Sequence, residues 1–224
     1  MVNCLVFFDL DDTLYKEIDF VSSAFAEISL YIEKTFGKAG LLEEMLALRD
    51  QGRDVFGMII DKYHLKGLTK EMLLSIYREH FPTVGLSLGA DAVLERLKSE
   101  GYVLGIITDG RSLTQRNKIN ALGISSFFDN YNVLISEEIG GEKLSGIPFE
   151  VVRDRYPGYE LWYVGDNVDK DFAPARICGF HTIGLLDDGR NIHHPVSSDA
   201  TKEPDYWAFT FPDIEHIICS HNGH

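Results

Sequence analysis

Residues 4–13 read Cys-Leu-Val-Phe-Phe-Asp-Leu-Asp-Asp-Thr, an apolar run that passes directly into an acid-rich turn. A short apolar run bounded by a turn signal is typical of a strand buried on both faces of a parallel sheet. Sheets of this kind bind ligands at the carboxyl ends of their strands. Asp9 and Asp11 lie two residues apart, so in an extended segment their carboxylates point the same way. Converging carboxylates favour a divalent cation, and Mg²⁺ is normally held by carboxylates together with substrate phosphate oxygens.

Two other interpretations of this turn are a solvated surface loop and a calcium site. Acid-rich turns after strands are common, so this stretch alone does not exclude the solvated loop. The calcium loop fails on spacing, because Leu14 stands where such a loop needs glycine and Phe20 stands where it needs its closing glutamate.

The pattern of an apolar run followed by a polar turn occurs twice more along the chain. Residues 102–107 lead into Thr-Asp-Gly at 108–110, and residues 161–164 lead into Gly-Asp-Asn-Val-Asp-Lys-Asp at 165–171. Between these segments, Lys143 ends the glycine-rich sequence Gly-Gly-Glu-Lys. The recurrence favours a common functional site over an isolated solvated turn.

This order of parts resembles the haloacid dehalogenase superfamily, in its phosphatase branch with a helical (C1-type) cap inserted after the first motif. Residues 9–13 match the family's D-x-D-x-T motif, and the later motifs match Thr108, Lys143 and residues 165–171. Leu144 stands where the family usually has proline after the lysine. The resemblance implies an α/β fold with a Rossmann-like doubly wound parallel sheet core and an inserted small all-helical cap domain.

For the catalytic residues, the resemblance implies covalent catalysis of phosphate-ester hydrolysis. Asp9 attacks phosphorus in line and becomes a transient aspartyl phosphate, while Asp11 protonates the leaving oxygen and later deprotonates the attacking water. Thr108 donates its hydroxyl to a phosphoryl oxygen, and Lys143 supplies a positive charge to the same group and to Asp9. The expected function is a Mg²⁺-dependent phosphatase, a phosphoric monoester hydrolase, acting on a small phosphorylated metabolite.

The resemblance also implies how the metal is bound. Mg²⁺ is expected to contact the Asp9 carboxylate, the backbone carbonyl of Asp11 and the Asp166 carboxylate, where it screens the nucleophile from the phosphoryl charge. Asp171 is expected to support this site by binding a metal water or Lys143.

Five further residues in or beside these motifs have roles that the motifs do not fix. Asp12 is expected to face away from the site and to cap, and Thr13 either fixes the turn through its hydroxyl or contacts ligand. The Asp109-Gly110 pair fits an ordinary turn, although its backbone N–H groups could cradle the phosphate. Arg111 is either a substrate contact or a surface charge.

The period of the apolar residues changes from strand-like to helical after the first motif. We therefore expect a cap domain over residues 14–82, between core segments 1–13 and 83–224; an extension of the core is the alternative. The first expected cap helix begins near residue 20 and ends near residue 37. Three more cover residues 41–48, 55–63 and 70–80.

The connection at residues 49–53 is expected to choose the substrate. Gly52 supplies a bend there, and the Arg53 guanidinium can meet a polar or anionic group. A solvated connection between helices is the alternative. Should this connection not read the substrate, Arg111 or the linker residues Lys16 and Glu17 are the next candidates.

Beyond Pro82, helical and strand patterns alternate, which indicates a parallel sheet covered by helices. Expected helices cover residues 90–99, 112–122, 148–154, 169–178 and 212–220. Expected strands cover residues 102–107, 131–135, 161–164, 180–185 and 206–209. Residues 187–204 are expected to form a polar loop. It contains His193-His194-Pro195, where a zinc site is disfavoured because no acid or cysteine at ligand spacing completes it.

Composition excludes several classes of partner. The 224-residue chain is 45% hydrophobic, enough for a sizeable core, and its net charge of −14 argues against a nucleic-acid partner. No membrane span or targeting segment is visible, and the three cysteines show no pairing pattern. We therefore expect a cytoplasmic protein, a monomer or small homo-oligomer, with no membrane partner.

Other functions are possible for a protein with these motifs. A sugar phosphomutase would return the phosphoryl group to substrate, and a non-catalytic binding protein would keep the fold without turnover. A dehalogenase is disfavoured because that chemistry dispenses with the second acid, which is present as Asp11.

Overall fold

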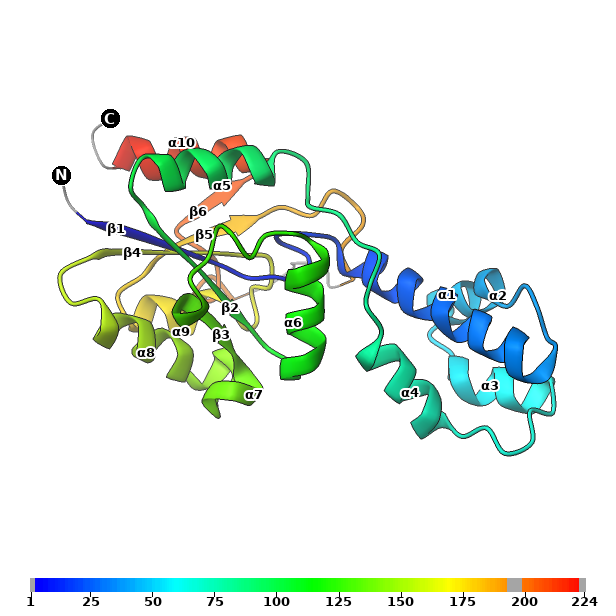
Figure 1. Cartoon of the computed structure of the whole chain (residues 1–224). Helices are drawn as coiled ribbons and strands as arrows, with labels where there is room; N and C mark the ends of the chain where they lie inside the picture. The colour runs from blue at the N-terminus through cyan, green and yellow to red at the C-terminus, as the bar shows by residue number, and fades with distance from the viewer. Residues whose placement is uncertain (1–2, 193–198, 222–224) are drawn as a thin grey trace.

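In the described part of the chain, six parallel strands form one sheet at the centre of the molecule (Figure 1). The computed structural model describes residues 3–192 and 199–221. The strand order is β3-β2-β1-β4-β5-β6, so the first strand lies in the interior of the sheet. The strands are β1 (Cys4–Phe8), β2 (Val103–Thr108), β3 (Val133–Ile135), β4 (Glu160–Gly165), β5 (His181–Leu185) and β6 (Tyr206–Ala208). This arrangement confirms the predicted α/β fold with a Rossmann-like parallel sheet.

Helices cover both faces of the sheet, as the alternation of patterns predicts. One face packs against α5 (Ala90–Ser99), α6 (Ser112–Ala121) and α10 (Phe211–His221), and the other against α8 (Ile147–Arg155) and α9 (Phe172–Ile177). Side chains of β1 alternate between the two apolar clusters. Both clusters are therefore anchored on the strand that leads into the acid-rich turn.

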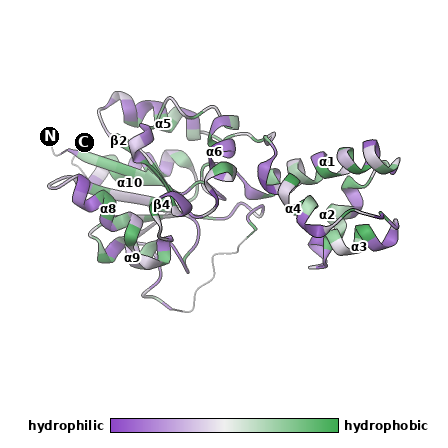
Figure 2. Ribbon diagram, turned by 60° about the horizontal axis from the view of Figure 1, so that its bottom comes forward, coloured by the Kyte–Doolittle hydropathy of each residue, from purple (hydrophilic) through white to green (hydrophobic). Residues whose placement is uncertain are grey.

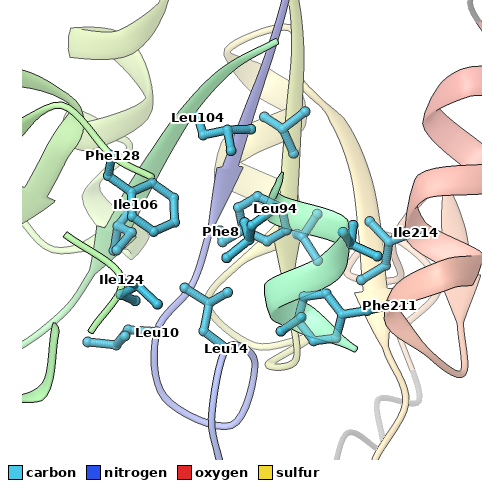
Figure 3. Packing of buried hydrophobic residues seen from close by; sticks show 14 of the residues in the cluster. Phe8, Leu10, Leu14, Leu94, Leu104, Ile106, Ile124, Phe128, Phe211 and Ile214 are labelled. Carbon is cyan, nitrogen blue, oxygen red and sulfur yellow. The ribbon is translucent and has the colours of Figure 1, made fainter. Parts of the chain in front are cut away.

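Packing in the first cluster fixes the position of that turn. Figure 3 shows Phe8, the last residue of β1, beside Leu94 of α5, in the same cluster as Phe211 of α10. The Phe8 and Phe211 rings stack with centroids 6.4 Å apart. Leu10 and Leu14, on either side of the acidic residues, are fully buried in the same cluster. Truncating one such buried phenylalanine to alanine typically costs about 3–5 kcal/mol, so the turn is held firmly.

Four helices between β1 and α5 form a separate group beside the sheet (Figure 1). They are α1 (Glu17–Phe36), α2 (Leu42–Asp50), α3 (Val55–Lys62) and α4 (Lys70–Glu79). Hydrophobic and hydrophilic residues alternate along them (Figure 2), and their apolar faces meet in a cluster distinct from the two on the sheet. Gly37 ends α1 in the left-handed conformation, and the Thr69 side chain caps α4.

Most expected elements are present; two differ in detail, and two short elements were not expected. Residues 130–132 form a 3₁₀ turn before β3, because the Asp129 carboxylate accepts a hydrogen bond from the Tyr131 N–H. The helix expected from 169 starts only at Phe172. A short helix, α7 (Ser136–Ile139), was not expected, and Lys143 lies in a 3₁₀ turn (Lys143–Ser145).

Among the described residues, no helix combines the length and the apolar character that a membrane span requires. None of the three cysteines, which all lie among the described residues, is in a disulfide, and Cys4 and Cys178 are buried in the core. The described parts of the expected polar loop, residues 187–192 and 199–204, contain no helix or strand, whereas His193-His194-Pro195 lies outside the described residues.

Candidate active site

The carboxyl ends of β1, β2 and β4 open into one polar pocket. The acid-rich turn follows β1, Thr108 ends β2, and Asp166 follows β4. The pocket is lined by Asp9, Asp11, Asp12, Glu17, Thr108, Asp109, Lys143, Asp166, Asn167 and Lys170. The structure therefore brings together parts of all four sequence motifs, at the edge of the sheet where parallel folds bind ligands.

Asp9 is held by an ion pair with Lys143. The Lys143 Nζ lies 2.8 Å from Asp9 Oδ2 and 2.6 Å from Asp171 Oδ1, and all three side chains are at most 8% exposed. The other oxygen of Asp9 accepts a hydrogen bond from the Leu10 N–H. Asp171 meets the lysine as expected, and Gly165 leaves room for it, because a Cβ at that position would overlap the Asp171 carboxylate.

The carboxylates of this pocket outnumber the cations that can neutralise them. Burial, followed by the charge of nearby Asp171, raises the pKa of Asp9 to about 7 despite the opposing effect of Lys143. Burial and the charges of Asp9 and Asp171 raise the pKa of Asp166 to about 9. Burial opposes the charged form of Lys143, but the two carboxylates outweigh it and raise the pKa of the ammonium. The pocket thus has a deficit of positive charge.

A divalent cation fits this deficit and these donors. Asp9, Asp166 and Asp171 are buried, and each offers a carboxylate oxygen within 4.8 Å of the others. Hard oxygen donors of this kind suit Mg²⁺. Asn191 reaches the same place from the loop after β5, where its Nδ2 lies 3.4 Å from Asp166 Oδ2. The residues expected to hold Mg²⁺ therefore lie together, with the exception of the Asp11 side chain.

Asp11 lines the pocket, but its carboxylate turns away from Asp9 toward α6. It accepts hydrogen bonds from Lys118 Nζ at 2.7 Å, Gln115 Nε2 at 2.9 Å and the Tyr15 hydroxyl. Burial raises its pKa, but Lys118 and these hydrogen bonds outweigh burial and lower it overall. The expectation that both carboxylates converge on one spot is corrected here. The segment after Asp9 is a turn and not an extended strand, so side-chain alternation does not apply to it.

The remaining residues of the first motif have structural partners. Asp12 is buried and accepts hydrogen bonds from the N–H groups of Glu17 and Ile192, so it caps the start of α1 as expected. It also lines the pocket, so the expectation that it faces away from the site is wrong. Thr13 is fully buried, and its hydroxyl has no hydrogen-bond partner among the described residues. Its hydroxyl therefore does not fix the turn in this structure.

Residues after β2 divide between the pocket and the surface. Thr108 is buried in the pocket, where Gln115 donates a hydrogen bond of 2.6 Å to its hydroxyl. Asp109 accepts the Lys143 backbone N–H at 2.9 Å, which fixes the lysine's turn. The Gly110 N–H donates to Ser136 Oγ at 2.9 Å, so it is not free to cradle phosphate as the sequence suggests.

The two arginines expected to contact substrate are exposed and lie outside the lining of the pocket. Arg111 precedes α6 and borders a neighbouring hollow with Gly140 and Glu142. Arg53 lies in the connection between α2 and α3. Contacts of either residue with substrate stay predictions.

Three residues that line the pocket or contact its lining were missed or ranked low by sequence reasoning. Gln115 and Lys118 lie three residues apart on α6 and face Asp11, but nothing in their own sequence indicates that contact. Glu17 is the first residue of α1 and the first acidic residue after the motif at residues 9–13. Burial and the charges of Asp11 and Asp12 raise its pKa to about 7. Its position just after the motif is the signal that makes it a candidate.

Comparisons with known proteins agree with this geometry. Residues 6–185 match the haloacid dehalogenase-like hydrolase family. Glyceraldehyde 3-phosphate phosphatase of Methanocaldococcus jannaschii is 33% identical over 204 residues, covering 81% of this chain and 84% of that protein. The protein of the same name from Pyrococcus furiosus is 30% identical over an alignment of 237 residues, covering 98% of this chain and 94% of that one.

A solved structure supports the fold independently. The haloacid dehalogenase-type hydrolase YfnB of Bacillus subtilis, determined with bound magnesium, superposes with a TM-score of 0.66 at 22% identity. The superposition covers 98% of this chain and 100% of that one. At this level of identity the likeness concerns the fold alone. The motifs, the strand order and the family match together establish that this chain belongs to the haloacid dehalogenase-like hydrolases.

Proposed function

We propose that this protein is a Mg²⁺-dependent phosphatase that hydrolyses a small phosphorylated metabolite through an aspartyl phosphate on Asp9. The observation that carries the proposal is the buried Asp9 carboxylate, which lies 2.8 Å from Lys143 and beside Asp166. A carboxylate can approach an anionic phosphate ester only where cations offset the repulsion. Lys143 supplies one such charge beside Asp9, and the neighbouring buried carboxylates suit a divalent cation as the second.

The family and the phosphatases that resemble this chain support its class, a phosphoric monoester hydrolase. Because two relatives that are at least 30% identical and cover most of the chain are glyceraldehyde 3-phosphate phosphatases, we propose a short phosphorylated aldehyde or sugar as the substrate class. Glyceraldehyde 3-phosphate is the first compound to test.

In the first step, an oxygen of Asp9 forms a bond to phosphorus as the bond to the leaving oxygen breaks. The electron pair of that bond stays on the leaving oxygen, which takes a proton from Asp11. In the second step, water attacks phosphorus, Asp11 accepts the water's proton, and the Asp9 carboxylate is released. Lys143 and Thr108 face the phosphoryl oxygens throughout. When bound between Asp9, Asp166 and the Asp11 carbonyl, Mg²⁺ supplies charge neutralisation at the phosphoryl group.

Asp11 must be protonated for the first step, whereas its contacts in this structure favour the carboxylate form. Lys118 is the main cause of this preference. An arriving phosphate dianion is a like charge, and like charges raise the pKa of a carboxyl group. We infer that substrate binding shifts Asp11 toward its acid form and draws it from Lys118 toward the leaving oxygen.

The four-helix group is proposed to be the cap, with residues 14–82 inserted between core segments 1–13 and 83–224. Its own apolar cluster supports this division. The cap carries Glu17 into the pocket and Arg53 in the α2–α3 connection. Closure of such a cap would exclude water and bring these polar groups to the leaving group.

Release of inorganic phosphate from glyceraldehyde 3-phosphate and a panel of other phosphorylated metabolites tests the proposal. We expect turnover with Mg²⁺, none in excess EDTA, and recovery when Mg²⁺ is restored. Activity that survives thorough chelation would remove Asp166 from its proposed role. Phosphoryl transfer to a second sugar without phosphate release would identify a mutase, and binding without either reaction would identify a non-catalytic protein.

A further inference from the structure

Three side chains able to bind metal lie together at the amino edge of the sheet, opposite the pocket. Glu160 begins β4, His181 begins β5 and His221 ends α10. Each offers one ligand atom within 4.8 Å of the others. Figure 1 shows that this edge, where β1 starts and α10 ends, is remote from helices α1–α4. At about 3.3 Å per residue, Glu160 lies roughly 20 Å along the chain from Asp166, so the two sites are separate.

The register of the strands holds this cluster in place. Trp162 pairs with His181 across β4 and β5, and Glu160 lies two residues before Trp162, on the same face of the sheet. The Trp162 indole donates a hydrogen bond of 2.7 Å to Glu160 Oε1. Its ring also packs against His181 and His221, with centroid separations of 4.8 and 5.2 Å. A hydrogen bond that orients a ligand's carboxylate is a common support of metal sites.

The donor set is that of a borderline transition metal and not of Mg²⁺. The two imidazole rings are 4.5 Å apart, and His221 Nδ1 lies 3.3 Å from Glu160 Oε1. Two imidazole nitrogens and one carboxylate oxygen are a recurrent ligand set for Zn²⁺, which takes water as a fourth ligand. His221 is 37% exposed, so water can reach the site. The carboxyl end of α10 also favours a cation through the helix dipole.

We propose that Glu160, His181 and His221 bind a divalent ion of the Zn²⁺ type, which ties the C-terminal helix to the start of β4 and β5. The competing arrangement is an ion pair between a protonated His221 and Glu160, with no metal. The two arrangements predict different responses to Zn²⁺, because an imidazolium cannot bind a metal ion.

Titration of the full-length protein with Zn²⁺ in excess Mg²⁺ tests the proposal. We expect one bound equivalent that depends on His221, and a rise in melting temperature as Zn²⁺ is added. His221→Gln should weaken this binding at least tenfold and remove the rise. His216→Gln, which replaces another exposed histidine of α10, is the matched control and should change neither. Phosphate release in Mg²⁺ should be the same in all three proteins.

Glu160→Gln and Co²⁺ provide a second measurement. The variant keeps an oxygen for Trp162 but loses the charge, so Zn²⁺ should bind more weakly. Co²⁺ in a site with two histidine nitrogens should give a visible absorption band that His221→Gln abolishes. Equal Zn²⁺ affinity in the wild type and His221→Gln, or loss of all bound Zn²⁺ to Mg²⁺, would overturn the proposal and leave the ion pair.

Discussion

Glu17→Gln should stabilise the protein at alkaline pH and have much less effect at acidic pH. Burial, together with the charges of Asp11 and Asp12, raises the pKa of Glu17 from 4.5 to about 7. Below pH 4.5 the carboxyl group is protonated in both the folded and the unfolded chain. Between 4.5 and 7 the unfolded chain ionises while the folded chain keeps its proton, so stability falls as the pH rises. Above pH 7 both states are ionised, and this loss of stability is complete.

The size of this effect follows from the same pKa values. At about 1.4 kcal/mol per pKa unit, the displacement corresponds to roughly 3 kcal/mol, an upper value for a group that keeps some solvent contact. The free energy of unfolding is to be measured with denaturant in EDTA, from about pH 5 to about pH 8.

The measured quantity is the difference in unfolding free energy between Glu17→Gln and the wild type. We expect this difference to grow by about 2–3 kcal/mol in favour of the variant across the range. Glu27→Gln, at an exposed position of the same helix, is the control and should give a constant difference. A constant difference for Glu17→Gln as well would refute the crowding of carboxylates in the pocket.

Three further substitutions, the first with a control, test separate parts of the site. Lys143→Met should lower kcat by about 10²–10³ and the unfolding free energy by about 3–5 kcal/mol, because it leaves buried carboxylates unpaired. Lys62→Met, which breaks an exposed pair, is the control and should lower the unfolding free energy far less than Lys143→Met does. Asp11→Asn should slow hydrolysis of alkyl phosphates more than of acyl phosphates, whose leaving groups need less protonation; equal losses would count against the acid role. Arg53→Ala should lower kcat/KM for the preferred metabolite by a factor that corresponds to about 1–3 kcal/mol of transition-state binding, and should leave kcat/KM for a small aryl phosphate nearly unchanged. Equal losses for both compounds would exclude the connection at residues 49–53 as the segment that chooses the substrate.

The fold could be predicted because its signals are local. Each buried strand is a short apolar run, each run ends in a turn, and the helices between them carry apolar faces of the right period. The order of these parts was sufficient to identify the family and the enzyme class, which the comparisons confirm. Lys143 reaches Asp9 even though Leu144 replaces the usual proline, because Asp109 fixes its turn from a distant segment.

Contacts between distant side chains could not be predicted from the sequence. The orientation of Asp11 depends on Gln115 and Lys118, more than a hundred positions away, and on a turn that the sequence suggested was extended. The Glu160 and His221 pair likewise joins β4 to α10, two elements that only the packing of the helix on the sheet brings together. Residue types and spacing report neither the direction of a side chain nor its partner across the fold.

The nucleophilic role of Asp9 is the central claim, and rapid quenching of a single turnover tests it most directly. After mixing with substrate and Mg²⁺, acid-quenched wild-type protein should carry one phosphoryl group on the peptide that contains Asp9. Asp9→Asn should carry none, should remain folded, and should lose at least about three orders of magnitude in kcat. A variant that retained a tenth of the activity, or a phosphoryl group found on another residue, would contradict the aspartyl-phosphate mechanism.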